Sequence, residues 1–399
     1  MFQNQDPVVI VGAARTPLGG FQGDFSEVTA PQLGASAIRA AVERSGVAPA
    51  QVEDVLMGCV LPAGLGQAPA RQAALGGGLP LSTACTTISK VCGSGMMATI
   101  IAHDLLLAGR QGAIVAGGME SMTNAPYLLP KARGGQRLGH GQIIDHMFFD
   151  GLEDRYSAAT NGRLMGTFAE DCAQHFKFSR EEQDAFAIAS TERARDAVSN
   201  GRFEWEIAPV EVAARGGSKR IAQDELPGKV QLDKVVSLKP AFAKDGSVTA
   251  ANSSSISDGA AALVLMRRSS ALAQGLQPLA VIHGHAAHAQ EPQWFTTAPV
   301  GAIQKLLAKV GWQVGDVDLW EINEAFAVVT MVAMRELGLP HERVNVHGGA
   351  CALGHPIGAT GARLLVTLLG ALRQQGKRRG VASLCIGGGE ATAVAIELC

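Results

Sequence analysis

The feature that most restricts the fold of this chain is an internal similarity between two segments about 265 residues apart. The first segment, 34–52, carries an apolar helical pattern that stops at Gly46 and precedes a β-like run from Val52. Gly311 and Val317 occupy the equivalent positions of the second segment, after a matching helix face. A match at this distance predicts two copies of one α/β unit.

Two further matches follow in the same order. The apolar run 113–115 ends in Gly-Gly-Met-Glu, and the run 384–386 ends in Gly-Gly-Gly-Glu. A loop of small residues opens the predicted helix 96–108, and a second such loop opens the helix 362–375. Three matches in the same order favour a duplicated α/β architecture over chance.

Several predicted strands are nearly continuous apolar runs, which is typical of sheets covered by helices on both faces. These runs are 8–11, 113–116, 261–266 and 381–386. The stretch 122–248 differs, with polar connections and an amphipathic helix over 179–199. Ser179 and Glu182 form a capping-box pattern at the start of that helix. We interpret this stretch as a subdomain inserted between the copies.

The charge balance excludes some classes of partner. There are 34 Lys and Arg against 36 Asp and Glu, a net charge of −2, which argues against a nucleic-acid binder. No run of about eighteen apolar residues occurs, so we expect no membrane association, and no leader pattern precedes the run 8–11. The seven cysteines form no CxxC pair or zinc-type spacing. We therefore expect no metal, and free thiols in the cytoplasm.

The segment 90–96 places Cys92 between glycines just before a predicted helix. Free N–H groups at a helix start lower the pKa of a nearby thiol, which suggests a nucleophile. For an isolated CGSG pattern, however, a small residue in a tight packing corner is the favoured interpretation.

Two further segments place polar side chains where ligands commonly bind. His355 lies in the glycine-rich loop 348–361 before another predicted helix, where its imidazole could contact a ligand. Asn323 and Glu324 follow the predicted strand 317–322, at the carboxyl edge of a parallel sheet. The alternatives are a structural histidine and a helix N-cap at Asn323.

Cys385 ends a predicted buried strand and precedes the glycines 387–389. The arrangement can combine a thiol with exposed backbone N–H groups, or it can be a buried cysteine before a tight turn. The triple glycine lacks the lysine and the spacing of a phosphate-binding loop.

The chain carries the motifs VCGSGM at 91–96, NEAF at 323–326, GGACALGHPIGATGAR at 348–363 and CIGGG at 385–389. In this order they resemble those of one family, the thiolases, and especially the acetyl-CoA acetyltransferases. The resemblance covers nearly the whole chain, starting from VGAARTP at 11–17.

The resemblance implies a role for each candidate residue. Cys92 matches the acylated nucleophile, and His355 the histidine that takes its proton. Cys385 matches the second cysteine, which moves a proton at the α-carbon. Asn323 matches the residue that positions a water, which forms one oxyanion hole with His355. The backbone N–H groups of Cys92 and Gly387 would form the other.

The resemblance also implies the architecture. It predicts two α/β halves with mixed five-stranded sheets in α-β-α-β-α layers, plus an inserted loop subdomain. We expect the first half to comprise 1–121 and 249–276, the loop subdomain over the coenzyme A site 122–248, and the second half 277–399.

The resemblance also implies contacts to the substrate, with looser matches to the motifs. Ser254 matches a contact to the pantetheine arm, Met165 and Phe326 match the acyl pocket, and Arg220 is expected near the adenine nucleotide. Leu164 replaces a histidine found in many short-chain members. The aromatic residues of the loop 292–297 favour a small acyl pocket.

These matches predict an acetyl-CoA C-acetyltransferase that converts two acetyl-CoA to acetoacetyl-CoA and CoA through an acetyl-cysteine. No cofactor beyond the coenzyme A thioesters, and a homo-oligomer (dimer or tetramer), are expected. The alternatives are a broader 3-ketoacyl-CoA thiolase in degradation and an inactive thiolase-like lipid-binding or scaffold protein. A ketoacyl synthase is disfavoured by the second cysteine, and the physiological direction stays open.

Overall fold

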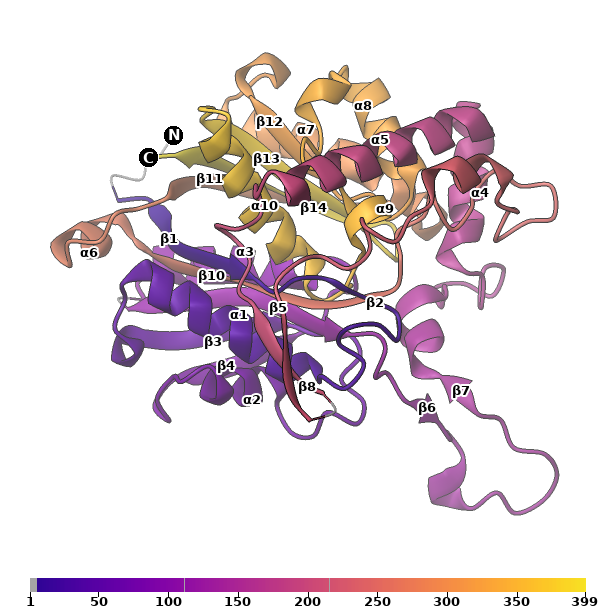
Figure 1. Cartoon of the computed structure of the whole chain (residues 1–399), viewed down its shortest axis with the longest axis horizontal. Coiled ribbons are helices and arrows are strands. Elements are labelled where there is room, and N and C mark those ends of the chain that lie inside the picture. Colours follow the sequence, from indigo (N-terminus) through magenta and orange to yellow (C-terminus); the bar gives the residue numbers. More distant parts are fainter. Residues whose placement is uncertain (1–5, 111, 215) are drawn as a thin grey trace.

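The computed structural model of the chain describes residues 6–110, 112–214 and 216–399 (Figure 1). The first half comprises β1 (Val8–Arg15), β2 (Gly19–Gly20), α1 (Ala30–Ser45), β3 (Val52–Gly58), α2 (Pro69–Gly76), β4 (Ala84–Ile88), α3 (Ser94–Leu107), β5 (Ala113–Ser121), β10 (Ser257–Arg267) and α6 (Arg268–Ala273). The second half comprises β11 (Ala280–Ala289), α7 (Ala298–Val310), β12 (Leu319–Ile322), α8 (Ala327–Leu337), α9 (Ala350–Leu353), α10 (Thr360–Gln374), β13 (Arg379–Ile386) and β14 (Glu390–Leu398).

The stretch between β5 and β10 forms helices along the upper side of the molecule, an arm at the lower right and a two-stranded pair near the lower edge (Figure 1). They are β6 (Tyr127–Leu128), β7 (Ile144–Asp145), a π-helical turn (Met147–Leu152), α4 (Met165–Phe176), α5 (Arg180–Ser199), β8 (Val210–Ala214) and β9 (Gly217–Ile221). The capping box of α5 is confirmed, because the Ser179 hydroxyl accepts from the Glu182 backbone N–H at 3.1 Å and the Glu182 carboxylate accepts from the Ser179 N–H at 2.7 Å. Among the described residues, no helix is both long and apolar enough to cross a membrane.

The main sheet runs in the order β12-β13-β14-β11-β1-β10-β5-β3-β4, with β2 paired to β10. The halves meet where β1 pairs with β11, through Val9 with Val281 and Ile10 with Ala280. In the described residues the first half supplies five strands to this path and the second half four. Beyond β12, Val344 makes a single parallel bridge to Trp320, where a fifth strand was expected.

Three apolar clusters pack the helices against the sheet. One packs α1 and α2 on the outer face of the first half, and a second packs α3 and α10 between the halves. A third packs α7 on the outer face of the second half. Alternate residues of β1 belong to different clusters: Val9 and Val11 to the outer one, Val8 and Ile10 to the central one. The expected layered α-β-α-β-α arrangement is confirmed.

The duplication shows in the helix ends, but one match is only approximate. Gly46 and Gly311 end α1 and α7 with the same left-handed φ of 72°. Gly117 and Gly118, in contrast, lie inside β5, where a Cβ on Gly118 would approach the Gly358 carbonyl oxygen to 2.0 Å. The glycines after β13 instead form the turn into β14. The glycines of β5 therefore allow a close approach to Gly358, whereas the glycines after β13 form a turn.

Candidate active site

Cys92 lies in a strained turn between β4 and α3. The preceding residue, Val91, has a φ of +45°, which is costly for a β-branched side chain. The Ser94 hydroxyl holds this turn, since it accepts from the Lys90 N–H at 2.8 Å and donates to the Val91 carbonyl at 2.7 Å. The turn presents Cys92 to a cavity instead of packing it in a corner.

The expectation of a lowered Cys92 pKa is wrong. Burial raises the pKa of Cys92 to about 11, although the backbone N–H groups of Gly387 and of Cys92 itself act in the opposite direction. Desolvation in a mostly apolar cavity therefore outweighs the backbone donors. The thiol is protonated at neutral pH and needs a base before it can attack.

His355 is placed to act as that base. Thr360, at the start of α10, donates its hydroxyl proton to the Pro356 carbonyl at 2.9 Å. Its oxygen is therefore the acceptor for Nδ1–H of His355, 2.6 Å away. This assignment leaves the lone pair on Nε2, and burial lowers the pKa of His355 to about 3, so the imidazole is neutral.

The side chains of Asn323 and Glu324, which follow β12, contact different parts of the protein. Asn323 is fully buried, with Nδ2 3.5 Å from Nε2 of His355, and its Oδ1 accepts no hydrogen bond from the described residues. Glu324 accepts from the Ser190 hydroxyl at 2.7 Å, from Nδ2 of Asn345 at 2.8 Å and from the Cys351 N–H at 3.0 Å. Asn323 thus faces the site, whereas Glu324 holds the surrounding loops together.

Cys385 is fully buried at the end of β13. Burial raises its pKa well above the ordinary value, and a negative charge on Cys92 raises it further, so the two thiols influence each other. Cys385 belongs to an apolar cluster with Phe295 and Phe326, behind the residues that line the cavity.

The cavity in front of these groups has a volume of about 480 Å³. Cys92, His355 and Gly387 line it, and three of the predicted substrate contacts do so as well: Ser254, Met165 and Phe326. Most of the remaining wall is apolar, with Phe148, Leu152, Leu164, Phe242, Phe295 and Ile357.

Two residues that the sequence associates with the substrate do not line this cavity. Arg220 lies on β9 and lines a separate cavity with Asp224 and Phe203. Of the aromatic pair in the loop 292–297, only Phe295 reaches the site, because Trp294 turns away and packs edge-on against His175 with ring centroids 5.0 Å apart.

Thr360 and Glu120 also hold the site in place, although no sequence pattern assigned either a role. Glu120 is fully buried and accepts from the backbone N–H groups of Val60, Leu61 and Gly358 at 2.9, 3.1 and 2.8 Å. It therefore ties the loop of His355 to the first half, and burial raises its pKa to about 7. Both residues lie inside recognised motifs, but only the folded contacts reveal what they hold.

Known proteins resemble the chain over its whole length. The family models described as thiolase N-terminal domain and thiolase C-terminal domain match residues 8–269 and 276–398. The chain is 52% identical over 393 residues to acetyl-CoA acetyltransferase 1 of Arabidopsis thaliana, covering 98% of this chain and 94% of that protein. It is 48% identical over 391 residues to acetyl-CoA acetyltransferase of Escherichia coli K12, covering 98% of each. The crystal structure of the Bacillus anthracis acetyl-CoA acetyltransferase matches with a TM-score of 0.95, at 41% identity and 99% coverage of both chains.

Proposed function

The chain belongs to the thiolase family, and from this premise we propose that it is an acetyl-CoA acetyltransferase whose catalytic groups line the cavity or lie directly behind its wall. The observation that carries the proposal is one cavity wall that combines Cys92, His355 and Gly387, with Asn323 next to the imidazole. The family shows that the chain is an acyltransferase, and the assignment of individual roles rests on this geometry.

In the first half-reaction, Nε2 of His355 takes the proton of Cys92. The thiolate attacks the thioester carbonyl of acetyl-CoA, the bond from that carbon to the coenzyme A sulfur breaks, and the leaving thiolate takes the proton back from His355. The products are acetyl-Cys92 and CoA. The high pKa of Cys92 makes the adjacent base necessary, because little thiolate exists without it.

In the second half-reaction, Cys385, whose raised pKa keeps it protonated, first gives its proton to Nε2 of His355. The resulting thiolate takes a proton from the methyl group of a second acetyl-CoA. The carbanion attacks the carbonyl of acetyl-Cys92, a carbon–carbon bond forms, and the bond from that carbon to the Cys92 sulfur breaks. The Cys92 thiolate takes the proton held by His355, and Cys385 keeps the methyl proton, so both thiols and the imidazole return to their starting states. The reverse sequence cleaves acetoacetyl-CoA.

Each half-reaction places negative charge on a carbonyl oxygen. The backbone N–H groups of Cys92 and Gly387 are proposed to stabilise the charge on the acyl group held by Cys92, consistent with the effect of both donors on its pKa. At this stage Nε2 of His355 carries the proton from Cys385, and this N–H, with a water positioned by Asn323, is proposed to stabilise the enolate of the second acetyl-CoA. The unpaired Oδ1 of Asn323 supports a polar partner at that position.

The proposed substrates are acetyl-CoA, acetoacetyl-CoA and CoA, and these steps need no further cofactor. Three aromatic side chains, of Phe242, Phe295 and Phe326, line the cavity in front of Cys385, which favours a short acyl group. Leu164 enlarges the apolar wall and favours the alternative of a broader 3-ketoacyl-CoA thiolase.

A thiolysis series with acetoacetyl-CoA, 3-ketohexanoyl-CoA and longer 3-ketoacyl-CoA tests the proposal. An acetyl-CoA acetyltransferase will show kcat/KM highest for acetoacetyl-CoA and falling with each added pair of carbons. Rates that stay level or rise with chain length would assign the broader thiolase activity, and no turnover with any substrate would favour a scaffold or lipid-binding role.

The free thiols and the exposed apolar side chains support the proposed compartment and the proposed assembly. All seven cysteines are free, which supports the cytoplasm as the proposed compartment. Tyr127, Leu138 and Ile143 expose 68, 99 and 67% of their surface on the arm around β6 and β7, which Figure 1 shows projecting from the molecule. Such exposed apolar side chains support the proposed homo-oligomer, a dimer or tetramer.

A further inference from the structure

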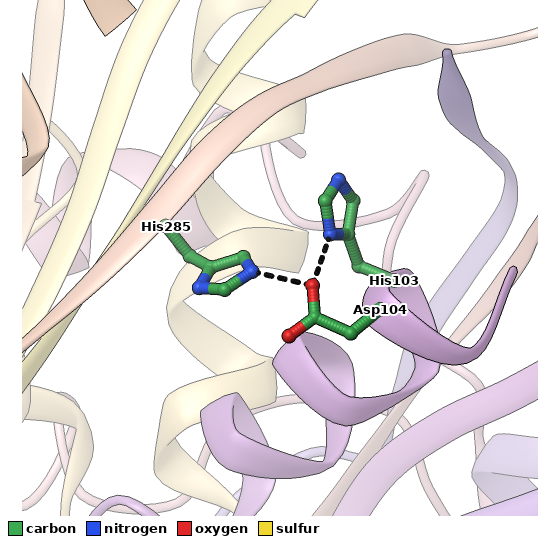
Figure 2. Close-up of side chains that lie close together, drawn as sticks. All are labelled: His103, Asp104 and His285. Atoms are coloured by element: carbon green, nitrogen blue, oxygen red, sulfur yellow. Dashed lines mark hydrogen bonds and ion pairs between the residues drawn. The ribbon is translucent and has the colours of Figure 1, made fainter. Parts of the chain in front are cut away.

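A second group of chemically active side chains lies at the far end of α3 from Cys92. His103 and Asp104 belong to the last turn of α3, in the first half, and His285 belongs to β11, in the second half. Nδ1 of His103 lies 3.0 Å from Oδ1 of Asp104, and Nε2 of His285 lies 2.8 Å from the same oxygen. Figure 2 shows the two imidazoles pointing at one carboxylate from different elements.

A β-bulge explains why His285 points this way. The register of β11 against β14 shifts between Ile282 and Gly284, which adds one residue to β11. Ile282 faces the central layer, while Gly284 faces α7, where a Cβ would meet Val310 at 2.9 Å. His285 therefore returns to the central face and meets α3. The extra residue re-aims this side chain toward the first half.

We propose that His103, Asp104 and His285 form a binding site for a divalent transition-metal ion of the zinc class, which would cross-link the two halves. The three ligand atoms lie within 4.8 Å of one another. Two imidazole nitrogens and one carboxylate oxygen are a donor set that suits Zn²⁺, at bond lengths of about 2.0–2.2 Å.

The surroundings allow an ion to enter and be held. The side chains of His103 and His285 are 9 and 15% exposed, whereas that of Asp104 is 58% exposed and can turn to admit an ion. The carbonyl end of α3 adds negative potential, which attracts cations.

One charged group opposes binding. Lys309 of α7 donates to the His285 carbonyl at 3.0 Å, which places a positive charge beside the proposed site. Lys309→Met removes this charge and its hydrogen bond to the His285 carbonyl, and it leaves the three ligand side chains unchanged. If an ion binds here, this variant will bind it more tightly than the parent protein.

The test measures Zn²⁺ affinity and stoichiometry of the full-length protein, with Mg²⁺ as the comparison ion. We expect one Zn²⁺ per chain and an increase in Tm on addition of Zn²⁺, because binding to the folded state stabilises it. His285→Ala and Asp104→Asn should each weaken binding by about tenfold or more. His283→Ala is the matched control, since this residue lies on the same strand but pairs with Glu397 at 3.0 Å.

Zinc can also bind thiols, so the ligand type needs its own readout. The Co²⁺-loaded protein should show visible ligand-field bands of nitrogen and oxygen ligands, without sulfur-to-metal charge transfer, and His285→Ala should abolish those bands. Zn²⁺ affinity that is unchanged in His285→Ala and Asp104→Asn would overturn the site and leave a hydrogen-bonded cluster. A sulfur charge-transfer band that persists in both variants would equally overturn it.

Discussion

The Thr360 hydroxyl accepts the Nδ1 proton of His355 at 2.6 Å because its own proton is donated to the Pro356 carbonyl. This relationship holds the imidazole in the tautomer whose Nε2 can receive the proton of Cys92. A residue five positions along the chain thus decides which nitrogen of the proposed base is free.

Thr360→Val removes this hydroxyl while keeping the shape of the side chain. We expect kcat to fall by about tenfold to a hundredfold, because a misoriented base loses part of the roughly 10²–10⁴-fold that proton transfer contributes. KM should change little, since Thr360 does not line the cavity. Thr360→Ser should restore most of the activity. Equal loss in both variants would show that the methyl group, and not the hydroxyl, matters.

Replacing the two thiols separates the half-reactions. Cys92→Ser should form no acetyl adduct with acetyl-CoA in intact-protein mass spectrometry. Cys385→Ala should still form one acetyl adduct but should lose acetoacetyl-CoA synthesis, because nothing then removes the methyl proton. An adduct on a residue other than Cys92, or synthesis by Cys385→Ala near the parent rate, would contradict the proposed roles.

Buried histidines make stability depend on pH. Burial lowers the pKa of His347 to about 4, against about 6.5 when unfolded, so the unfolded chain binds the extra proton first as pH falls. Its contribution to stability is therefore full above about pH 6.5 and declines toward pH 4, by up to about 1.4 kcal/mol per pH unit. Glu120 and other buried carboxyls with raised pKa act in the opposite direction, because they stabilise the protein as the pH falls. The contribution of His347 must therefore be measured as a difference in stability between the parent protein and a variant.

His347→Gln provides that difference, since glutamine stays uncharged. The urea midpoint of the variant, relative to the parent, should rise as pH decreases from 7.5 to 5. His140→Gln, on the exposed arm, is the matched control and should show no such trend. A parent–variant difference that is constant with pH would refute the assignment.

An ion pair between Lys90 and Glu390 links the turn before Cys92 to the strand that follows the triple glycine. The sequence offered no chemical role for Glu390, and the structure supplies a positioning one. Glu390→Ala should cost no more than about 1 kcal/mol of stability, because both side chains are partly exposed. We expect the variant also to misalign the Gly387 N–H with Cys92. An activation free energy higher by about 1 kcal/mol would lower kcat by about fivefold.

Glu397→Ala is the control for this prediction. Glu397 belongs to the same strand and pairs with Arg378, Arg379 and His283, none of which lines the cavity. Its loss should affect stability and leave kcat unchanged. If Glu390→Ala and Glu397→Ala lower kcat equally, the Lys90 pair has no special role at the site.

The sequence by itself determined the duplicated layers and the identity of the candidate catalytic residues. Apolar periodicity and glycine helix ends such as Gly46 and Gly311 are local signals, and they survive folding because each depends on a few neighbouring residues. Motifs that present Cys92, His355, Asn323 and Cys385 are equally local.

Only the tertiary structure decided the properties that depend on segments remote in the chain. The sign of the Cys92 pKa shift depends on burial by cavity walls from both halves and from the stretch between them. The position of Arg220 away from the cavity depends on how β9 packs. The contact of Asp104 with His285 spans 181 positions and requires a bulge in β11. Desolvation and long-range contacts arise when distant segments pack together, and no local pattern records them.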